Sequence, residues 1–202
     1  MNTNRQWVLA KRPSGLVTQD NFTYTETPIP EPGDGEVLVR NLYLSFDPTQ
    51  RGWMEDRPSY LPPVAIGEPM RAGSVGQVVE SRHADFATGD LVQTTGGWQD
   101  FVVVAPGQGP MGLSKVPEGV SAQMMLSVLG ITGLTAYFGL LDLGNPQPGE
   151  TVLVSGAAGA TGSVAGQIAR IKGCNVVGIA GGPEKCAWLK DEAGFHDVID
   201  YK

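Results

Sequence analysis

The sequence predicts a small all-β domain, a barrel or sandwich, followed by the first half of a doubly wound α/β domain. Three observations lead to this prediction. Short strand-like segments separated by glycine- and proline-rich turns fill the first part of the chain. A long apolar, helix-compatible stretch follows at 121–141, with Gly130 and Gly133 interrupting it. Strands and helices then alternate in the order β-α-β-α-β. We therefore expect residues 1–123 to form the β domain and 124–202 a partial α/β domain.

The strands of the first domain are predicted from partly alternating or apolar segments bounded by turn residues. They cover residues 6–10, 36–44, 73–81, 90–95 and 99–104. Glycine- and proline-containing turns, such as the one at 31–35, separate them. The glycines within 73–81 indicate a bulge or the close approach of another backbone.

The second domain is predicted from a regular alternation of apolar strands and amphipathic helices. Buried strands are expected at 151–155 and 175–180, helices at 160–173 and 183–194, and a third strand at 197–200. Pro183 suits the first turn of its helix. Because a complete doubly wound domain needs a second half, we expect the chain to be truncated.

The bulk composition limits the classes of partner. The 202 residues carry a formal net charge of −7, and phosphate-rich surfaces would repel so acidic a chain, so nucleic-acid and membrane partners are not expected. The N-terminus has no signal-peptide pattern, and no apolar run reaches the roughly 20 residues of a membrane helix. We therefore expect a cytoplasmic protein. The two cysteines and two histidines are scattered, so no metal site is expected.

A glycine-rich turn between a strand and a helix, at 155–162, predicts a dinucleotide site. Aligned with the pattern G-x-G-x-x-G, Ala157 takes the first glycine position, and Gly159 and Gly162 take the other two. Gly159 would let the backbone approach a pyrophosphate, and Gly162 would let the helix pack tightly on the strand. The pyrophosphate would lie at the helix N-terminus, where free N–H groups favour negative charge. The alternative is an ordinary tight turn.

The end of the second α/β strand indicates which dinucleotide is bound. NAD sites place an acidic residue there to bind the ribose 2′-OH, but this chain reads Ala180-Gly181-Gly182-Pro183-Glu184-Lys185. Lys185 in the first helical turn favours a 2′-phosphate, and hence NADP(H). The alternative is that Lys185 is a solvated surface lysine, and Glu184 points mildly against the phosphate.

The whole chain resembles the zinc-independent medium-chain dehydrogenases/reductases, in particular their prostaglandin reductase-like branch. The motifs that carry the resemblance are 44–48 (LSFDP), 67–71 (GEPMR), 130–137 (GITGLTAY), 155–163 (SGAAGATGS), 171–178 (IKGCNVVG), Lys185 and 200–202 (DYK). The resemblance implies a GroES-like β-barrel domain followed by the first half of a Rossmann domain, with NADPH between them. It also implies a homodimer for the full-length protein.

The resemblance further implies the site residues and the reaction. The family's cofactor-binding positions fall on Gly159, Ala160, Thr161 and Gly162 for the pyrophosphate, on Lys185 and Tyr201 for the 2′-phosphate, and on Thr135 beside the nicotinamide. The family reduces the carbon–carbon double bond of α,β-unsaturated ketones and aldehydes, with hydride transfer to the β-carbon. The alternatives are an NADPH-dependent quinone reductase and a non-catalytic NADPH-binding relative. A fragment of 202 residues is expected to be inactive alone.

Two departures from the family concern the substrate rather than the cofactor. Where the family often reads Asp-Pro-Tyr-Met-Arg, this chain has Thr49 in place of the tyrosine and ends the motif at Arg51. The family's Gly-Met-Pro-Gly is replaced by the sequence at 130–133 (GITG). Tyr60 resembles a tyrosine that some members place at the substrate, and is our candidate hydroxyl donor. Arg51 is a candidate anion or carbonyl contact. The alternatives are a loop tyrosine and a helix-surface salt bridge, respectively.

Overall fold

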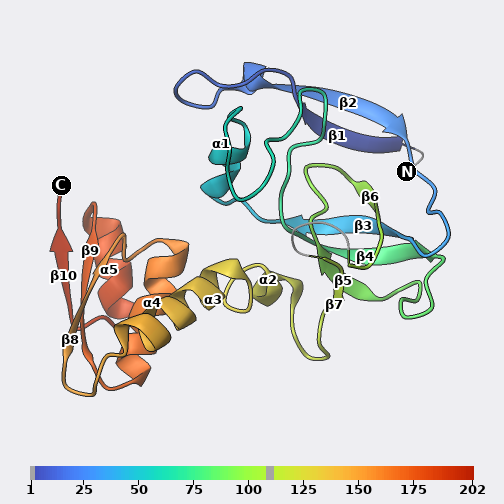
Figure 1. The fold of residues 1–202 in the computed structure, drawn as a ribbon. Coiled ribbons are helices and arrows are strands. Elements are labelled where there is room, and N and C mark those ends of the chain that lie inside the picture. The colour runs from blue at the N-terminus through green and yellow to red at the C-terminus, as the bar shows by residue number, and fades with distance from the viewer. Residues whose placement is uncertain (1–2, 108–111) are drawn as a thin grey trace. The chain divides into compact units, whose positions relative to one another are not determined.

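The computed structural model describes residues 3–107 and 112–202. It divides into two compact parts, Met1–Leu126 and Ser127–Lys202, here called the β unit and the α/β unit (Figure 1). The division falls three residues after the boundary that the sequence predicts between residues 123 and 124.

The β unit is built on a five-stranded antiparallel sheet with the order β6-β3-β4-β5-β7. Its strands are β3 (Val37–Leu44), β4 (Ser74–Ser81), β5 (Leu91–Thr94), β6 (Phe101–Val104) and β7 (Ser114–Lys115). The register between β3 and β4 shifts twice, and a Cβ on Gly76 would lie 2.5 Å from the carbonyl oxygen of Arg40. Of the two alternatives predicted for the glycines of 73–81, the close approach of another backbone is confirmed at Gly76, and one of the register shifts lies beside it.

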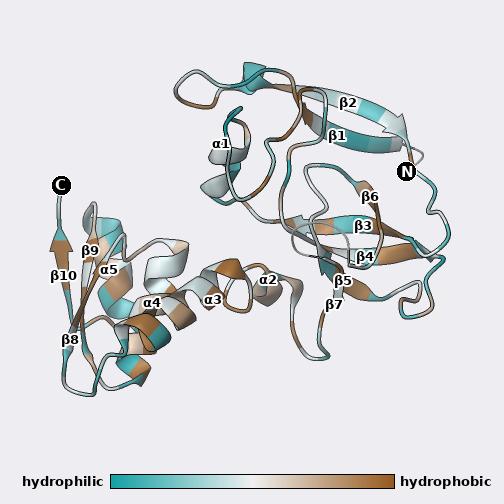
Figure 2. Cartoon of the chain, viewed as in Figure 1, coloured by the Kyte–Doolittle hydropathy of each residue, from teal (hydrophilic) through white to brown (hydrophobic). Residues whose placement is uncertain are grey.

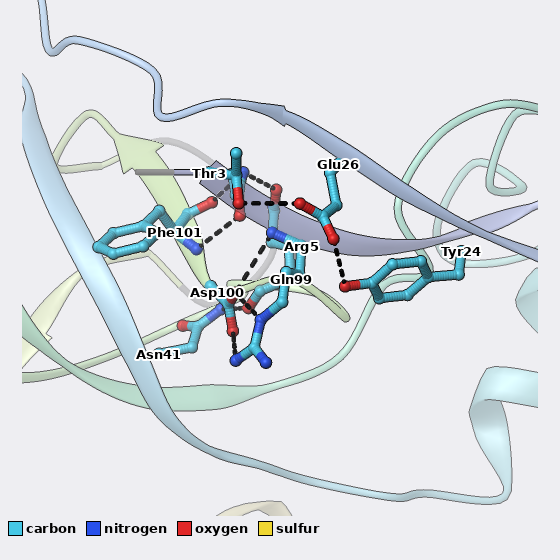
Figure 3. Close-up of polar contacts among 9 residues, drawn as sticks. Thr3, Arg5, Tyr24, Glu26, Asn41, Gln99, Asp100 and Phe101 are labelled. Carbon is cyan, nitrogen blue, oxygen red and sulfur yellow. Dashed lines mark hydrogen bonds and ion pairs between the residues drawn. The ribbon is translucent and has the colours of Figure 1, made fainter. Parts of the chain in front are cut away.

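A second, two-stranded sheet in the β unit pairs β1 (Thr3–Leu9) with β2 (Phe22–Pro28). β2 was not predicted from the sequence, because its residues alternate weakly and end in proline. Side chains attach this hairpin to the segment that leads into β6 (Figure 3). Asn4 donates to the carbonyl oxygen of Phe101 at 3.0 Å and accepts from its N–H at 2.9 Å, while Arg5 forms an ion pair with Asp100.

Two apolar clusters form the core of the β unit. The first lies within the five-stranded sheet and consists of Val37, Val39, Val78 and Val92. The second consists of Leu9, Met54, Val64 and Met70, with Trp53 and Trp98 packed against it. Short helices η1 (Gln19–Asn21), α1 (Thr49–Trp53) and α2 (Ala122–Met125) complete the unit. Because Trp53 packs on the second cluster, α1 has a fixed position on the β unit.

The α/β unit has a parallel sheet with the order β10-β9-β8. Its elements are α3 (Ile131–Phe138), η2 (Gly139–Gly144), β8 (Thr151–Ser155), α4 (Ala160–Ile171), β9 (Asn175–Ala180), α5 (Pro183–Asp191) and β10 (Asp197–Asp200). Its core consists mainly of small and aliphatic residues, including Ala169, Val176 and Leu189, with Phe195. Figure 2 shows both apolar and polar residues along β10 and α5.

Two details differ from the sequence prediction. The helix-compatible stretch 121–141 is divided into α2, α3 and the start of η2. The turn before α3 is tight, since a Cβ on Gly133 would lie 1.8 Å from the Val128 carbonyl oxygen. β8, predicted as a buried strand, alternates between exposed and half-buried residues. Among the described strands, β8 lies at an edge of the sheet, whereas the central β9 buries Val176 and Ala180. No helix in residues 3–107 and 112–202 is long and apolar enough to cross a bilayer.

Candidate cofactor-binding site

The turn after β8 is shaped by Gly156 rather than by the aligned Ala157. Gly156 has a φ of +58°, in the left-handed region that favours glycine. Ala157 is fully buried, and its N–H donates to the Ile179 carbonyl oxygen at 3.0 Å, which ties the turn to β9. The residue that makes the tight turn, Gly156, therefore directly precedes the first position of the G-x-G-x-x-G alignment. The signal that could have found it is the position of Gly156 directly after the last strand residue.

Gly162 and Gly159 keep this loop narrow. A Cβ on Gly162 would lie 2.5 Å from the Gly156 carbonyl oxygen and 3.0 Å from the Ala157 Cα atom. Gly162 thus allows α4 to pack against the turn at Gly156 and Ala157. From the sequence, α4 was expected to pack on the strand instead. A Cβ on Gly159 would lie 3.1 Å from the same carbonyl oxygen. Side chains at either position would crowd the loop.

The N-terminus of α4 presents donors that can bind an anion. Gly159 is the N-cap residue and contributes no side-chain cap, so Ala160, Thr161 and Gly162 lie in a first turn whose N–H groups lack intrahelical acceptors. Gly159 and Ala160 are exposed. Because free N–H groups and the helix dipole both favour negative charge here, this turn suits a pyrophosphate.

The segments that follow β9 and β10 meet at the same edge of the sheet. The Tyr201 N–H donates to the Ala180 carbonyl oxygen at 3.1 Å. A Cβ on Gly181 would lie 2.7 Å from Cζ of Tyr201, so the tyrosine ring rests on the Gly181 backbone. Since parallel strands have their carboxyl ends at one edge, this cluster and the glycine loop after β8 lie on the same side of the α/β unit.

Lys185 lies in the first turn of α5 and is exposed. In the part of the chain that the structure describes, no ion pair involves its ammonium group, whereas Lys190 on the same helix pairs with Asp197 at 2.9 Å. The Asp200 carboxylate, also at this edge, accepts hydrogen bonds from Gly182 and Lys202. These residues fit the phosphate groups of NADP(H): the glycine loop leaves room for a pyrophosphate, and Lys185 and the exposed Tyr201 can meet a 2′-phosphate.

Thr135 lies on α3, where its hydroxyl donates to the Ile131 carbonyl oxygen at 2.6 Å. It is exposed, so its oxygen can still accept a hydrogen bond. The replacement of the family's Gly-Met-Pro-Gly by the sequence at 130–133 has a local structural consequence. Thr132, at the position of the family's proline, donates through its hydroxyl to the Ser127 carbonyl oxygen at 3.0 Å and so braces the turn before α3.

On the β unit, Tyr60 is 73% exposed, and its hydroxyl is hydrogen-bonded to Oγ1 of Thr49. Thr49 occupies the position where the family often has tyrosine, so the substituted residue contacts the candidate hydroxyl donor. The Trp53 ring lies edge-on to the Tyr60 ring, with centroids 6.4 Å apart. The Arg71 guanidinium lies over the Trp53 ring, with Cζ 5.3 Å from the ring centroid. Arg71 ends the motif at 67–71 but was not among the predicted site residues.

Arg51 donates to neighbouring groups of the β unit. Its Nη1 atom bonds Glu55 at 2.8 Å, and Nε and Nη2 bond the Gly15 carbonyl oxygen at 3.3 and 3.0 Å. These contacts fasten α1 to the loop that contains Gly15. Its proposed contact with an anion or a carbonyl stays a prediction. In residues 3–107 and 112–202, no three His, Cys, Asp or Glu side chains gather in a way that could hold a metal ion.

Comparisons with known proteins show what the chain is similar to. Residues 5–113 match the family described as the N-terminal domain of oxidoreductase. The chain is 48% identical over 198 residues to NADPH-dependent curcumin reductase of Escherichia coli (strain K12), covering 98% of this chain and 56% of the relative. It is 40% identical over 198 residues to prostaglandin reductase 1 of Bos taurus, covering 98% of this chain and 58% of the relative.

A solved structure, CurA of Vibrio vulnificus in complex with NADPH, superimposes with a TM-score of 0.89 at 47% identity, covering 98% of this chain and 58% of that one. The predicted fold class, a GroES-like β domain followed by the first β-α-β-α-β half of a Rossmann domain, is confirmed. The chain spans little more than half the length of the curated relatives that it matches.

Proposed function

Because the chain belongs to the zinc-independent medium-chain dehydrogenase/reductase family, in its prostaglandin reductase-like branch, we propose that it acts in NADPH-dependent reduction of the carbon–carbon double bond of α,β-unsaturated ketones and aldehydes. The observation that carries the proposal is the pair of anion-binding features at one edge of the α/β sheet. One is the glycine loop at 155–162, and the other consists of the segments after β9 and β10, which carry Lys185 and Tyr201. The name of the curcumin reductase relative supports the choice of reaction.

The chain's own residues would bind the cofactor at three points. The N–H groups at the start of α4 would donate to the pyrophosphate. Lys185 and the Tyr201 hydroxyl would bind the 2′-phosphate, since an ammonium group and a phenol both donate to phosphate oxygens. Thr135 would face the nicotinamide. Bound NADPH would supply the hydride that the β-carbon of the substrate receives.

The residues of the β unit would act on the carbonyl end of the substrate. Negative charge develops on that oxygen as the β-carbon gains hydride, and a hydroxyl donor stabilises it. Tyr60 is suited to this role because its ring is exposed while its hydroxyl is oriented by Thr49. When Thr49 donates to the Tyr60 oxygen, the Tyr60 proton is free to donate to the substrate. A proton must also reach the α-carbon, and no residue is assigned to that step.

The test is a pair of measurements on the full-length protein, because the 202 residues alone are expected to be inactive. NADPH and NADH binding is measured first, and NADPH consumption is then followed with a panel of enones and enals and a panel of quinones. Binding that prefers NADPH, with consumption driven by enones, is the expected result. Consumption with quinones alone would replace the reaction by quinone reduction. Binding without consumption by either panel would indicate a non-catalytic NADPH-binding protein, and failure to bind NADPH would overturn the proposal.

A further inference from the structure

Asp200 joins two segments at the edge of the sheet where the 2′-phosphate is proposed to bind. Its Oδ1 atom accepts a hydrogen bond from the Gly182 N–H at 2.9 Å and another from the Lys202 N–H at 3.0 Å. Gly182 belongs to the turn between β9 and α5, and Lys202 follows β10. The two bonds lower the pKa of Asp200, with the Gly182 bond as the larger cause. Its negative charge is therefore stabilised by backbone donors at this edge.

The turn that Asp200 contacts determines where α5 begins. Gly182 has a φ of +96°, a backbone conformation that residues other than glycine rarely adopt. Pro183 follows as the first helical residue, and Lys185 lies in the same first turn. The hydrogen bond from Gly182 to Asp200 therefore fixes the turn from which Lys185 is presented.

The same edge places the Tyr201 ring. Its N–H is bonded to the Ala180 carbonyl oxygen at 3.1 Å, and its ring lies on Gly181. A Cβ on Gly181 would lie 2.7 Å from the ring carbon Cζ and 2.8 Å from the hydroxyl oxygen, so any side chain there would displace the ring. Tyr201 is nevertheless 68% exposed, which leaves its hydroxyl accessible to a ligand.

We propose that Asp200 and Gly181 are positioning residues that determine the preference of this protein for a 2′-phosphorylated adenine nucleotide. Asp200 orients the Gly182 turn, and with it Lys185, by accepting two backbone hydrogen bonds. Gly181 lets the Tyr201 ring approach the backbone beside that turn. Neither residue contacts the phosphate in this scheme. The inference depends on the proposed NADPH site and adds two residues that the glycine motif and Lys185 do not include.

The experiment uses the full chain with two probes, 2′,5′-ADP and 5′-AMP, whose binding is measured by isothermal titration calorimetry. The variants are Asp200→Ala, Asp200→Asn and Gly181→Ala. The matched control is Asp197→Ala, which removes an acidic residue from the start of the same strand, away from the turn at Gly182. Because 5′-AMP lacks the 2′-phosphate, its affinity reports the integrity of the rest of the site.

We expect Asp200→Ala and Gly181→Ala to weaken 2′,5′-ADP binding by about tenfold, the effect of losing a turn-fixing interaction of ordinary strength, and to change 5′-AMP binding by less than about twofold. Asp200→Asn should restore most of the 2′,5′-ADP affinity, because the amide oxygen can accept both backbone bonds. Equal losses for both probes, unchanged 2′,5′-ADP binding in Asp200→Ala, or an Asn variant as weak as the Ala variant would overturn the inference. If the unmodified chain does not prefer 2′,5′-ADP, the NADPH assignment itself fails.

Discussion

Arg5 and Asp100 are joined by two side-chain hydrogen bonds, from Nε to Oδ2 at 2.6 Å and from Nη2 to Oδ1 at 3.0 Å (Figure 3). The pair links β1 to the residue before β6, and the Arg5 N–H also donates to Oδ2 at 3.2 Å. The hydrogen bond from Arg5 is the largest cause that lowers the pKa of Asp100. The folded state therefore favours the charged carboxylate more than the unfolded chain does.

This relationship predicts how the stability of the β unit depends on pH. Because the pKa of Asp100 is lower in the folded state, its contribution is fully present above the unfolded value of about 3.9 and is lost as pH falls through the folded value. Asp100→Asn should lower the melting temperature by roughly 2 to 4 °C near neutral pH. Thermal unfolding followed by circular dichroism should show this difference shrinking at strongly acidic pH. Asp34→Asn, in an exposed turn, is the control, and a pH-independent difference would contradict the prediction.

Gly162→Ala should weaken NADPH and NADH binding alike. The new Cβ would lie 2.5 Å from the Gly156 carbonyl oxygen, so the loop must move away from the position that the pyrophosphate requires. Since both nucleotides share the pyrophosphate, we expect a loss of about tenfold or more for each. Fluorescence titration of both nucleotides checks this. Gly139→Ala is the matched control, because its Cβ would meet no atom within 4 Å. A selective loss for one nucleotide would contradict the pyrophosphate role.

Lys185→Ala, unlike Gly162→Ala, should weaken NADPH binding selectively. Its ammonium group would interact only with the 2′-phosphate, so NADPH affinity should fall by about tenfold while NADH affinity stays within about twofold of its original value. The measurement is the ratio of the two dissociation constants. Lys190→Ala removes a lysine of the same helix that is paired with Asp197, and should leave the ratio unchanged. Equal losses for both nucleotides would rule out a 2′-phosphate role for Lys185.

The sequence predicted the α/β unit more closely than the β unit. The strands expected at 151–155, 175–180 and 197–200 match β8, β9 and β10, because apolar segments alternating with helical ones have few other arrangements. β2 was missed because its polar, partly exposed residues lack a clear alternation. The burial of β8 was wrong because burial depends on the neighbours of a strand, which local periodicity does not specify.

The candidate site was only partly predictable for the same reason. The glycine loop was found because its residues are contiguous, but the sequence did not indicate that Gly156, just before the aligned pattern, makes the tight turn. Contacts such as the Tyr201 ring on Gly181 and Arg71 over Trp53 join residues from separate segments. No local pattern encodes such contacts, so they could be found only from the structure.

Tyr60→Phe should lower kcat/KM for enone reduction at saturating NADPH by about a hundredfold or more, the range expected for the loss of a hydroxyl donor to a developing oxyanion. The edge-on contact between Tyr60 and Trp53 does not require the hydroxyl, so the ring should keep its place. Thr49→Val should produce a smaller decrease, because Tyr60 would keep its donor and lose only the partner that orients it. Tyr43→Phe, on β3, removes an equivalent hydroxyl and is the control. Steady-state kinetics with one enone at several concentrations measures all three variants, and an unchanged kcat/KM for Tyr60→Phe would remove this hydroxyl from the reaction.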